Sequence, residues 1–348
     1  MAGKIRVGII GAVSSYSLHY GQALNALPDV EFVGMAYLGR DPKYIRDALN
    51  LPWLTKYPKT VEGYAETFGV PVFETADALI AEAKPDALCI CTEDYLREKY
   101  AMLAIDHGAH VFLPKPFAKS REEAERIFRA AGAKGLVATP DLPQRFRPLW
   151  ATAMGIVSEG AIGRPISGHF AVAHHLTLGG WKSDTSMAAG PELEVGFYVF
   201  DAMRMLMQSE PVKVMGVGAN LDHRGIPSID NGKCLVTCAN GALASIDLVL
   251  SMHHPFPPAG SAYVIGDEGA LAVVGNEIEV HTAAGVEKRE VPGWHHTERE
   301  LAAWLDVCRG HGSGGAMQED GLRTLDLILA YKKSHESGDA VFLGGEEG

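Results

Sequence analysis

Apolar residues follow two different patterns along this chain, and the pattern changes before its middle. Up to residue 123, short apolar runs alternate with segments in which apolar residues recur every three or four positions. The runs, among them 5–10, 31–38 and 86–92, predict buried strands, and the periodic segments predict helices. This alternation is typical of right-handed βαβ units on a parallel sheet. We therefore expect a doubly wound α/β domain over residues 1–123.

Beyond residue 123 long extended runs dominate, from residue 166 to residue 291. Asn240 and Gly241, between two apolar runs, predict a two-residue hairpin. Strands that follow one another without helices indicate antiparallel pairing. We expect residues 124–348 to form an α+β domain with a large, mostly antiparallel open sheet. Helices are predicted in or beside this half at 120–135, 147–160, 298–311 and 319–338.

One connection in the first half is unusually long. About thirty residues, 40–69, join the second predicted strand to the third, and connections of this length are uncommon. The tryptophan, leucines and prolines within it favour a packed excursion over disorder.

Charge and cysteine content narrow the classes of partner. The chain has 348 residues and a formal net charge of -12, which argues against nucleic acid and anionic membrane surfaces, because both need a basic patch. Its five cysteines include no C-x-x-C pair, so neither a disulfide framework nor a zinc knuckle is expected. The apolar run at the N-terminus is too short for a signal peptide or a membrane span. These features predict a cytoplasmic protein with a small-molecule partner.

The turn after the first predicted strand has part of a phosphate-binding fingerprint. The pattern G-x-G-x-x-G keeps its first glycine as Gly11, but Val13 and Tyr16 stand at the other two positions. Backbone N–H groups at the start of the next helix, around Ser14 to Ser17, still suit a pyrophosphate, although the side chains of Val13 and Tyr16 would crowd it. The predicted cofactor contacts of this turn are Gly11, Ala12, Val13 and Ser14. The turn by itself therefore neither predicts nor excludes the binding of a dinucleotide.

The end of the second predicted strand is where a dinucleotide-binding domain contacts the ribose. Tyr37 stands where NAD enzymes place an acidic residue. Arg40 favours NADP, whereas the neighbouring Asp41 favours NAD, so both cofactors remain open.

Residues 91–118 contain two further strand ends. Thr92 and Asp94 follow one predicted strand, and Lys115 with Pro116 follows the next. This stretch resembles the signature of the glucose-fructose oxidoreductase and inositol dehydrogenase family, in which the strands end in Thr-Pro-Asn and Glu-Lys-Pro. The resemblance implies a Rossmann-type first domain and a bound NAD or NADP that Thr92, Asp94 and Lys115 contact. It also implies a functional Lys115 at the carboxyl edge of the sheet. The departures from the signature are Glu93, Arg97 and Pro114.

The resemblance extends over nearly the whole chain, through residues 144–148, 159–165 and the final helices. It is most informative at 188–207, where the family helix has the pattern Gly-Gly-Gly-x-Leu-Asp-x-Gly-x-His-x-x-Asp and carries substrate-binding and catalytic groups. The matching positions here are Gly190, Glu194, Gly196, Tyr198 and Asp201.

This helix can also be analysed without the family. Glu194, Tyr198 and Asp201 are spaced i, i+4, i+7 and share one face, while the remainder is apolar. Such a polar stripe lines a cavity or is satisfied by internal partners, so Asp201 is either a substrate ligand or a structural hydrogen-bond partner. Tyrosine is a weak base at neutral pH, and the cation of Lys115 would favour its phenolate. We expect Lys115, Tyr198 and Glu194 to be catalytic.

The histidines include three adjacent pairs, at 174–175, 253–254 and 295–296. Adjacent residues on a strand point to opposite faces, so no pair is a chelate and no metal site is expected. The residues predicted to contact substrate are Arg145, His174, His175, Trp181, Lys182, Glu194 and Asp201.

The favoured function is NAD(P)-dependent oxidation or reduction of a hydroxyl in a sugar, glycoside or cyclitol. Two alternatives remain open: a redox-neutral glycoside hydrolase that oxidises C3 transiently, and a non-catalytic sugar or nucleotide sensor. The family resemblance and the open sheet also predict a homodimer or homotetramer.

Overall fold

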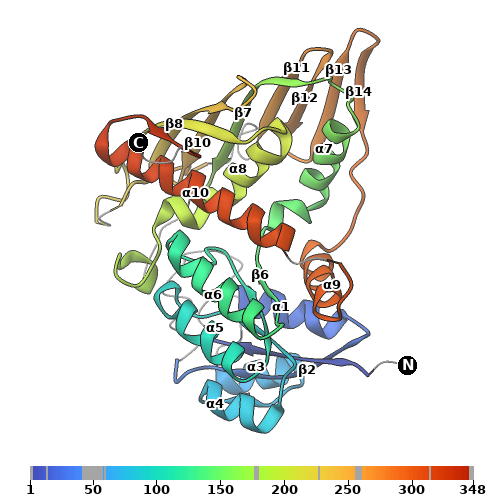
Figure 1. Ribbon diagram of the computed structural model, residues 1–348, viewed down its shortest axis with the longest axis vertical. Helices are drawn as coiled ribbons and strands as arrows, with labels where there is room; N and C mark the ends of the chain where they lie inside the picture. Colours follow the sequence, from blue (N-terminus) through green and yellow to red (C-terminus); the bar gives the residue numbers. More distant parts are fainter. Residues whose placement is uncertain are drawn as a thin grey trace. The chain divides into compact units, whose positions relative to one another are not determined.

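In the computed structural model, the described residues are 3–12, 15–40, 58, 60–175, 180–225, 228–254, 261–312 and 315–344. The chain divides into two compact units (Figure 1). The first unit comprises Met1–Asp141, Leu178–Gly190 and Thr297–Leu322, and the second comprises Leu142–Thr177, Pro191–His296 and Arg323–Gly348.

The first unit contains a six-stranded parallel sheet in the order β3-β2-β1-β4-β5-β6. The order reverses between β1 and β4, which is the switch point of a doubly wound sheet. The predicted Rossmann-type sheet is confirmed. Its strands are β1 (Ile5–Ile10), β2 (Val30–Ala36), β3 (Val72–Phe73), β4 (Ala87–Ile90), β5 (His110–Leu113) and β6 (Ala138–Pro140).

The first unit continues past the boundary predicted at residue 123. Strand β6 pairs with β5, so the sheet is complete only near Asp141. Helix α9 (His296–Cys308), much later in the chain, also packs against this sheet. The rings of Trp304 on α9 and Phe112 on β5 lie 5.2 Å apart. The helices of this unit are α1 (Ser15–Ala26), α3 (Val61–Phe68), α4 (Ala76–Ala78), α5 (Arg97–Asp106), α6 (Arg121–Ala133) and α9 (His296–Cys308).

The second unit contains a nine-stranded sheet in the order β14-β13-β12-β11-β7-β10-β9-β8-β15. Neighbouring strands are antiparallel except β7 and β10, which run parallel. The predicted mostly antiparallel sheet is therefore confirmed. The strands are β7 (Pro165–Ala173), β8 (Pro211–Ala219), β9 (Asn231–Cys238), β10 (Leu243–Val249), β11 (Ala262–Gly266), β12 (Gly269–Val274), β13 (Glu277–Thr282), β14 (Gly285–Arg289) and β15 (Val341–Phe342).

The predicted hairpin joins β9 to β10. The amide N–H of Ala242 donates to Oδ1 of Asn240 at 3.0 Å, and Gly241 has a φ of 85°, in the left-handed region that glycine tolerates. The dipeptide therefore forms the turn that the sequence indicated.

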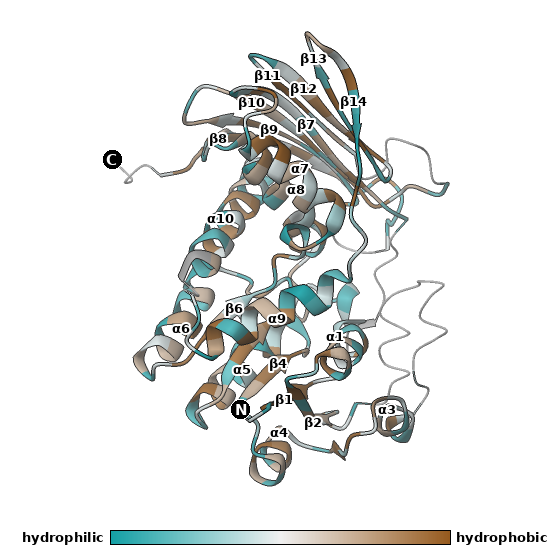
Figure 2. Cartoon of the chain, turned by 90° about the vertical axis from the view of Figure 1, so that its right-hand side faces the viewer, coloured by the Kyte–Doolittle hydropathy of each residue, from teal (hydrophilic) through white to brown (hydrophobic). Residues whose placement is uncertain are grey.

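Helices of the second unit cover one face of its sheet, as Figures 1 and 2 show. They are α7 (Pro148–Ser158), α8 (Pro191–Met207) and the part of α10 (Gly315–Ser337) that begins at Arg323. Helices α8 and α10 approach closely at Gly196, where an added Cβ would lie 3.3 Å from the side chain of Ile328. Large exposed apolar side chains on the strands include Met215, Val217, Leu235, Leu243, Tyr263 and Ile265.

Most of the long connection predicted at 40–69 lies outside the described residues, which resume at Pro58 and Thr60. Its end forms α3, and the side chain of Thr60 caps this helix by accepting from Gly63 N at 3.1 Å. Among the described helices, none combines the length and the apolar character needed to cross a membrane.

Candidate functional site

Gly11 occupies a place in the β1–α1 turn where a side chain does not fit. Its φ is 97°, and a Cβ there would lie 2.4 Å from the carbonyl oxygen of Cys91. Its N–H donates to the carbonyl oxygen of Ala36 at 2.8 Å. The turn therefore passes closely between the ends of β2 and β4. Ala12 is buried in this turn, and Val13 and Ser14 lie outside the described residues.

Tyr16, at the third fingerprint position, faces Lys115. The Lys115 Nζ lies 5.7 Å from the centre of the Tyr16 ring. The same ring contacts Tyr20, with the ring centres 5.4 Å apart. The structure therefore uses the position of the missing glycine for an aromatic and cation–π contact.

The end of β2 carries an ion pair with a buried partner. Arg40 Nε lies 3.1 Å from Oε1 of Glu93, and the Glu93 side chain is fully buried. The other carboxylate oxygen, Oε2, has no hydrogen-bond partner among the described residues. Tyr37 is half-buried beside this strand end.

A cavity of about 620 Å³ opens at the carboxyl ends of β2 and β3. Open α/β sheets bind their ligands at this edge. The residues that line it include Leu38, Glu74, Thr75, Lys99 and Tyr100.

Thr92 and Asp94, after β4, are both buried. Oδ2 of Asp94 accepts from the N–H of Ala189 at 2.9 Å, and Oδ1 lies 3.2 Å from a guanidinium nitrogen of Arg97. Both carboxylate oxygens therefore have protein partners. The predicted cofactor role of Thr92 and Asp94 stays a prediction.

Lys115 is 3 % exposed, and its backbone is held on both sides by Arg97. The guanidinium donates to the carbonyl oxygens of Pro114, at 3.0 Å, and Pro116. It also donates to the carbonyl oxygen of Thr92 at 2.8 Å. Arg97 thus joins the strand end after β4 to the strand end after β5 and fixes the lysine between its two prolines.

Asp141 gives Lys115 a further contact, which the sequence analysis missed. Its Oδ2 accepts from Lys115 N at 3.3 Å and from the Tyr20 hydroxyl at 3.0 Å. Burial raises the pKa of the Asp141 carboxyl, against the opposing effect of hydrogen bonds from Glu300 and these two groups. Burial, followed by the charge of Asp141, raises the pKa of Tyr20. Asp141 directly follows β6. Its place at the carboxyl end of a parallel strand was therefore the signal in the sequence that pointed to it.

In the second unit, Arg145 and Asp201 are paired with each other. Two guanidinium nitrogens of Arg145 lie 3.1 and 2.9 Å from the two carboxylate oxygens of Asp201. The Thr324 hydroxyl also donates to Asp201, at 3.0 Å, and the carboxylate is fully buried. This geometry matches the alternative in which Asp201 is a structural hydrogen-bond partner. The substrate contacts predicted for the pair stay predictions.

Glu194 and Tyr198 lie four residues apart on α8, and both side chains are half-buried among buried apolar neighbours. The guanidinium carbon of Arg147 lies 5.0 Å from the centre of the Tyr198 ring. Arg147 Nε is buried and has no hydrogen-bond partner among the described residues. The cation over the ring restrains the direction of the phenol.

The other predicted substrate residues have different surroundings. Trp181 and Lys182 are buried, and the Lys182 Nζ lies 5.1 Å from the Trp181 ring centre. His174 and His175 are exposed, and the His175 ring lies 4.5 Å from the ring of His253. Direct contact of these side chains with substrate stays a prediction.

Comparison with known proteins gives matches to both units. Residues 5–142 match the model of an oxidoreductase family with an NAD-binding Rossmann fold. Residues 150–272 match the model of a GFO/IDH/MocA C-terminal domain.

Individual proteins match this chain at low sequence identity. The chain is 25% identical over 294 residues to a 1,5-anhydro-D-fructose reductase of Ensifer adhaerens, covering 80% of this chain and 86% of the relative. It is 25% identical over 252 residues to an inositol 2-dehydrogenase of Acidothermus cellulolyticus, covering 70% and 72%. The fold is similar to that of an aldose-aldose oxidoreductase from Caulobacter crescentus, with a TM-score of 0.80, 20% identity, and coverage of 98% and 100%.

Proposed function

Because the chain belongs to the oxidoreductase family with an NAD-binding Rossmann fold and a GFO/IDH/MocA C-terminal domain, we propose that it acts on a sugar, glycoside or cyclitol. The reaction is oxidation of a hydroxyl-bearing carbon, or reduction of the corresponding ketone. The buried Lys115, fixed by Arg97 and Asp141 at the carboxyl edge of the NAD-binding sheet, is the observation that carries this proposal. The names of the relatives, which act on an anhydrosugar and on inositol, support the substrate class.

The residues of the first unit fit a dinucleotide. Gly11 permits the tight β1–α1 turn, because a side chain there would meet Cys91 O at 2.4 Å, and this turn is where such domains bind the pyrophosphate. The cavity beyond β2 and β3 has room for the adenosine end, since about 620 Å³ is within the range of small-molecule sites. NAD, when bound, supplies a hydride acceptor or donor at nicotinamide C4.

Side chains of this protein hold the substrate and transfer the proton of its hydroxyl. In the oxidative direction, the phenolic oxygen of Tyr198 takes the proton of the substrate hydroxyl, while the hydrogen on the same carbon leaves with its electron pair. Glu194 accepts a hydrogen bond from a neighbouring hydroxyl. Arg147, 5.0 Å from the ring centre, orients Tyr198, and Lys115 donates a hydrogen bond to the reacting oxygen. In the reductive direction, the phenol returns the proton.

NAD is the preferred cofactor in this proposal. A 2′-phosphate needs a cation whose charge is not already balanced. Arg40 is the cation at the end of β2, and the carboxylate of Glu93 lies 3.1 Å from it. That carboxylate would repel a 2′-phosphate, whereas its partnerless oxygen can accept from a hydroxyl.

We also propose that the chain works as a homodimer or homotetramer in the cytoplasm. The strands of the second unit expose large apolar side chains, including Leu235 and Val217 at 61% and 63%, and an exposed apolar patch marks a contact surface. All five cysteines are free thiols, which suits a reducing compartment.

The test is turnover with added NAD⁺ and a panel of cyclitols, aldoses and glycosides, followed by NADH absorbance. The proposal predicts steady NADH accumulation with at least one substrate. Lys115→Met lowers kcat by about 100-fold or more, while the matched change at an exposed lysine, Lys134→Met, leaves it unchanged. Aglycone release without net NADH, or binding of the sugars without turnover, contradicts the proposal.

A further inference from the structure

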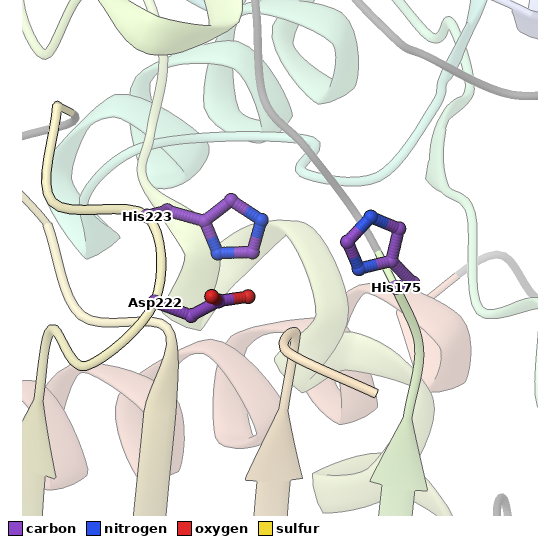
Figure 3. A group of neighbouring side chains, drawn as sticks. All are labelled: His175, Asp222 and His223. Atoms are coloured by element: carbon purple, nitrogen blue, oxygen red, sulfur yellow. The ribbon is translucent and has the colours of Figure 1, made fainter. Parts of the chain in front are cut away.

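Two connections of the second unit bring together side chains that bind metals elsewhere. His175 follows β7, and Asp222 with His223 lies in the connection from β8 to β9. One potential ligand atom from each of the three residues lies within 4.8 Å of the other two. Figure 3 shows the His223 ring and the Asp222 carboxylate on the side that faces His175. The cluster thus combines residues from two connections that are far apart in sequence.

The spacing is close to that of a bound ion. Two ligands that each lie about 2.1 Å from zinc are at most about 4.2 Å apart. In tetrahedral geometry such ligands lie about 3.4 Å apart, so the three atoms, which lie within 4.8 Å of one another, need to approach by at most about 1.4 Å. His175 and Asp222 are exposed, so rotation of these side chains can supply that movement without repacking the interior.

His223 is held by a buried carboxylate in the way that metal-binding histidines are. Its Nδ1 lies 3.2 Å from Oδ2 of Asp230, and the Asp230 side chain is 3 % exposed. The carboxylate accepts the proton of Nδ1, which leaves the lone pair on Nε2 for a metal. Asp230 is itself fixed, because the backbone N–H groups of Asp222 and His223 both donate to Oδ2 at 2.7 Å.

A candidate fourth ligand, His253, lies close to two of the three residues. The Nε2 of His253 lies 2.8 Å from Oδ2 of Asp222, and the His253 ring centre lies 4.5 Å from that of His175. His175 and His253 are held near each other by backbone contacts, since His175 pairs with Ser251. With His253, three imidazoles and one carboxylate are available to one ion.

We propose that His175, Asp222 and His223 bind a divalent transition-metal ion, with His253 as the fourth ligand and Asp230 as the positioning residue for His223. Imidazole nitrogens with one carboxylate oxygen suit Zn²⁺ in tetrahedral geometry. The bound ion joins the end of β7 to the β8–β9 connection. This site is independent of the proposed redox function.

The test is calorimetric titration of Zn²⁺ into the untagged, chelator-treated full chain. The expected result is about one Zn²⁺ bound per chain. His175→Ala and Asp222→Ala abolish this binding. The matched control is His281→Ala, which removes another exposed histidine next to a carboxylate, Glu279 at 3.2 Å, and leaves Zn²⁺ binding unchanged.

Co²⁺ substitution supplies a second readout. Intense visible absorption typical of four-coordinate Co²⁺ is expected, and His253→Ala changes that spectrum. Asp230→Asn weakens Zn²⁺ binding by about 10- to 100-fold, with circular dichroism as the check that the variant is folded. Absence of Zn²⁺ binding, or binding that His175→Ala and Asp222→Ala leave intact, overturns the proposal.

Discussion

Arg97 lies with a guanidinium nitrogen 3.0 Å from the carbonyl oxygen of Pro114, the residue before Lys115. The same nitrogen donates to Pro116, the residue after it. Arg97 is 2 % exposed, so this bridge is shielded from water. Its guanidinium donates to three carbonyl oxygens, those of Thr92, Pro114 and Pro116, which a side chain with fewer donors cannot bind together.

Replacing Arg97 therefore displaces Lys115. Arg97→Lys keeps the charge but loses the fork of donors, and we expect kcat to fall by about 100-fold because a small misplacement of a catalytic group has that effect. The affinity for NAD, measured by calorimetry, changes much less. Arg126→Lys, at an exposed arginine 2.6 Å from Glu98, serves as the control. Wild-type kcat in folded Arg97→Lys would show that Lys115 needs no such support.

The turn at Gly11 gives a prediction about cofactor binding. A Cβ at this position would lie 2.4 Å from Cys91 O, so Gly11→Ala forces the turn away from β4. We expect NAD to bind at least about tenfold more weakly, which is about 1.4 kcal/mol. Gly132→Ala on α6, where nothing lies within 4 Å of the added Cβ, leaves the affinity unchanged. Equal affinities of the two variants in fluorescence titration would contradict a phosphate site at this turn.

Glu93 predicts the choice between the two nicotinamide cofactors. With the carboxylate 3.1 Å from Arg40, the wild-type chain uses NAD with the higher kcat/KM. Glu93→Gln removes the negative charge and releases the arginine for a 2′-phosphate, so the ratio of kcat/KM for NADP to that for NAD rises by about tenfold. The measurement is initial rate against the concentration of each cofactor. A wild-type preference for NADP, or a ratio that does not move in Glu93→Gln, refutes this assignment.

The apolar strand face predicts association. Leu235 on β9 is 61% exposed, and a charge there opposes burial against another copy. We expect wild-type protein to sediment as a dimer or tetramer and Leu235→Lys to shift it toward the monomer. Leu221→Lys, at a side chain that is equally exposed but lies outside the strands, is the control. A monomeric wild-type chain would mean that this face has another partner.

The sequence predicted both sheets and the strand ends that carry Thr92 and Lys115, because alternating patterns identify strands and parallel strands end at one edge. It did not predict what holds Lys115. Arg97 was noted only as a departure from a family pattern, and Asp141 was not considered. Their roles depend on contacts between β4, β5 and β6, and strand order is not evident in local periodicity.

The histidines show the same limit. Adjacent histidines on a strand point apart, which excludes a chelate within one pair only. His175 and His223 come from separate connections of the second sheet and approach each other only after β7, β10, β9 and β8 have assembled in that order. Side-chain clusters of this kind are a property of the sheet and not of any single segment.

The most direct test of hydride transfer is mass spectrometry of the cofactor after a single turnover with a C-deuterated substrate found in the panel. The proposal predicts that one deuterium moves with its electron pair, as deuteride, from the hydroxyl-bearing carbon to nicotinamide C4. It also predicts that Tyr198→Phe slows this transfer by about 100-fold or more, while Tyr263→Phe, at an exposed tyrosine on β11, does not. NADH without deuterium, or undiminished transfer in Tyr198→Phe, would contradict the account.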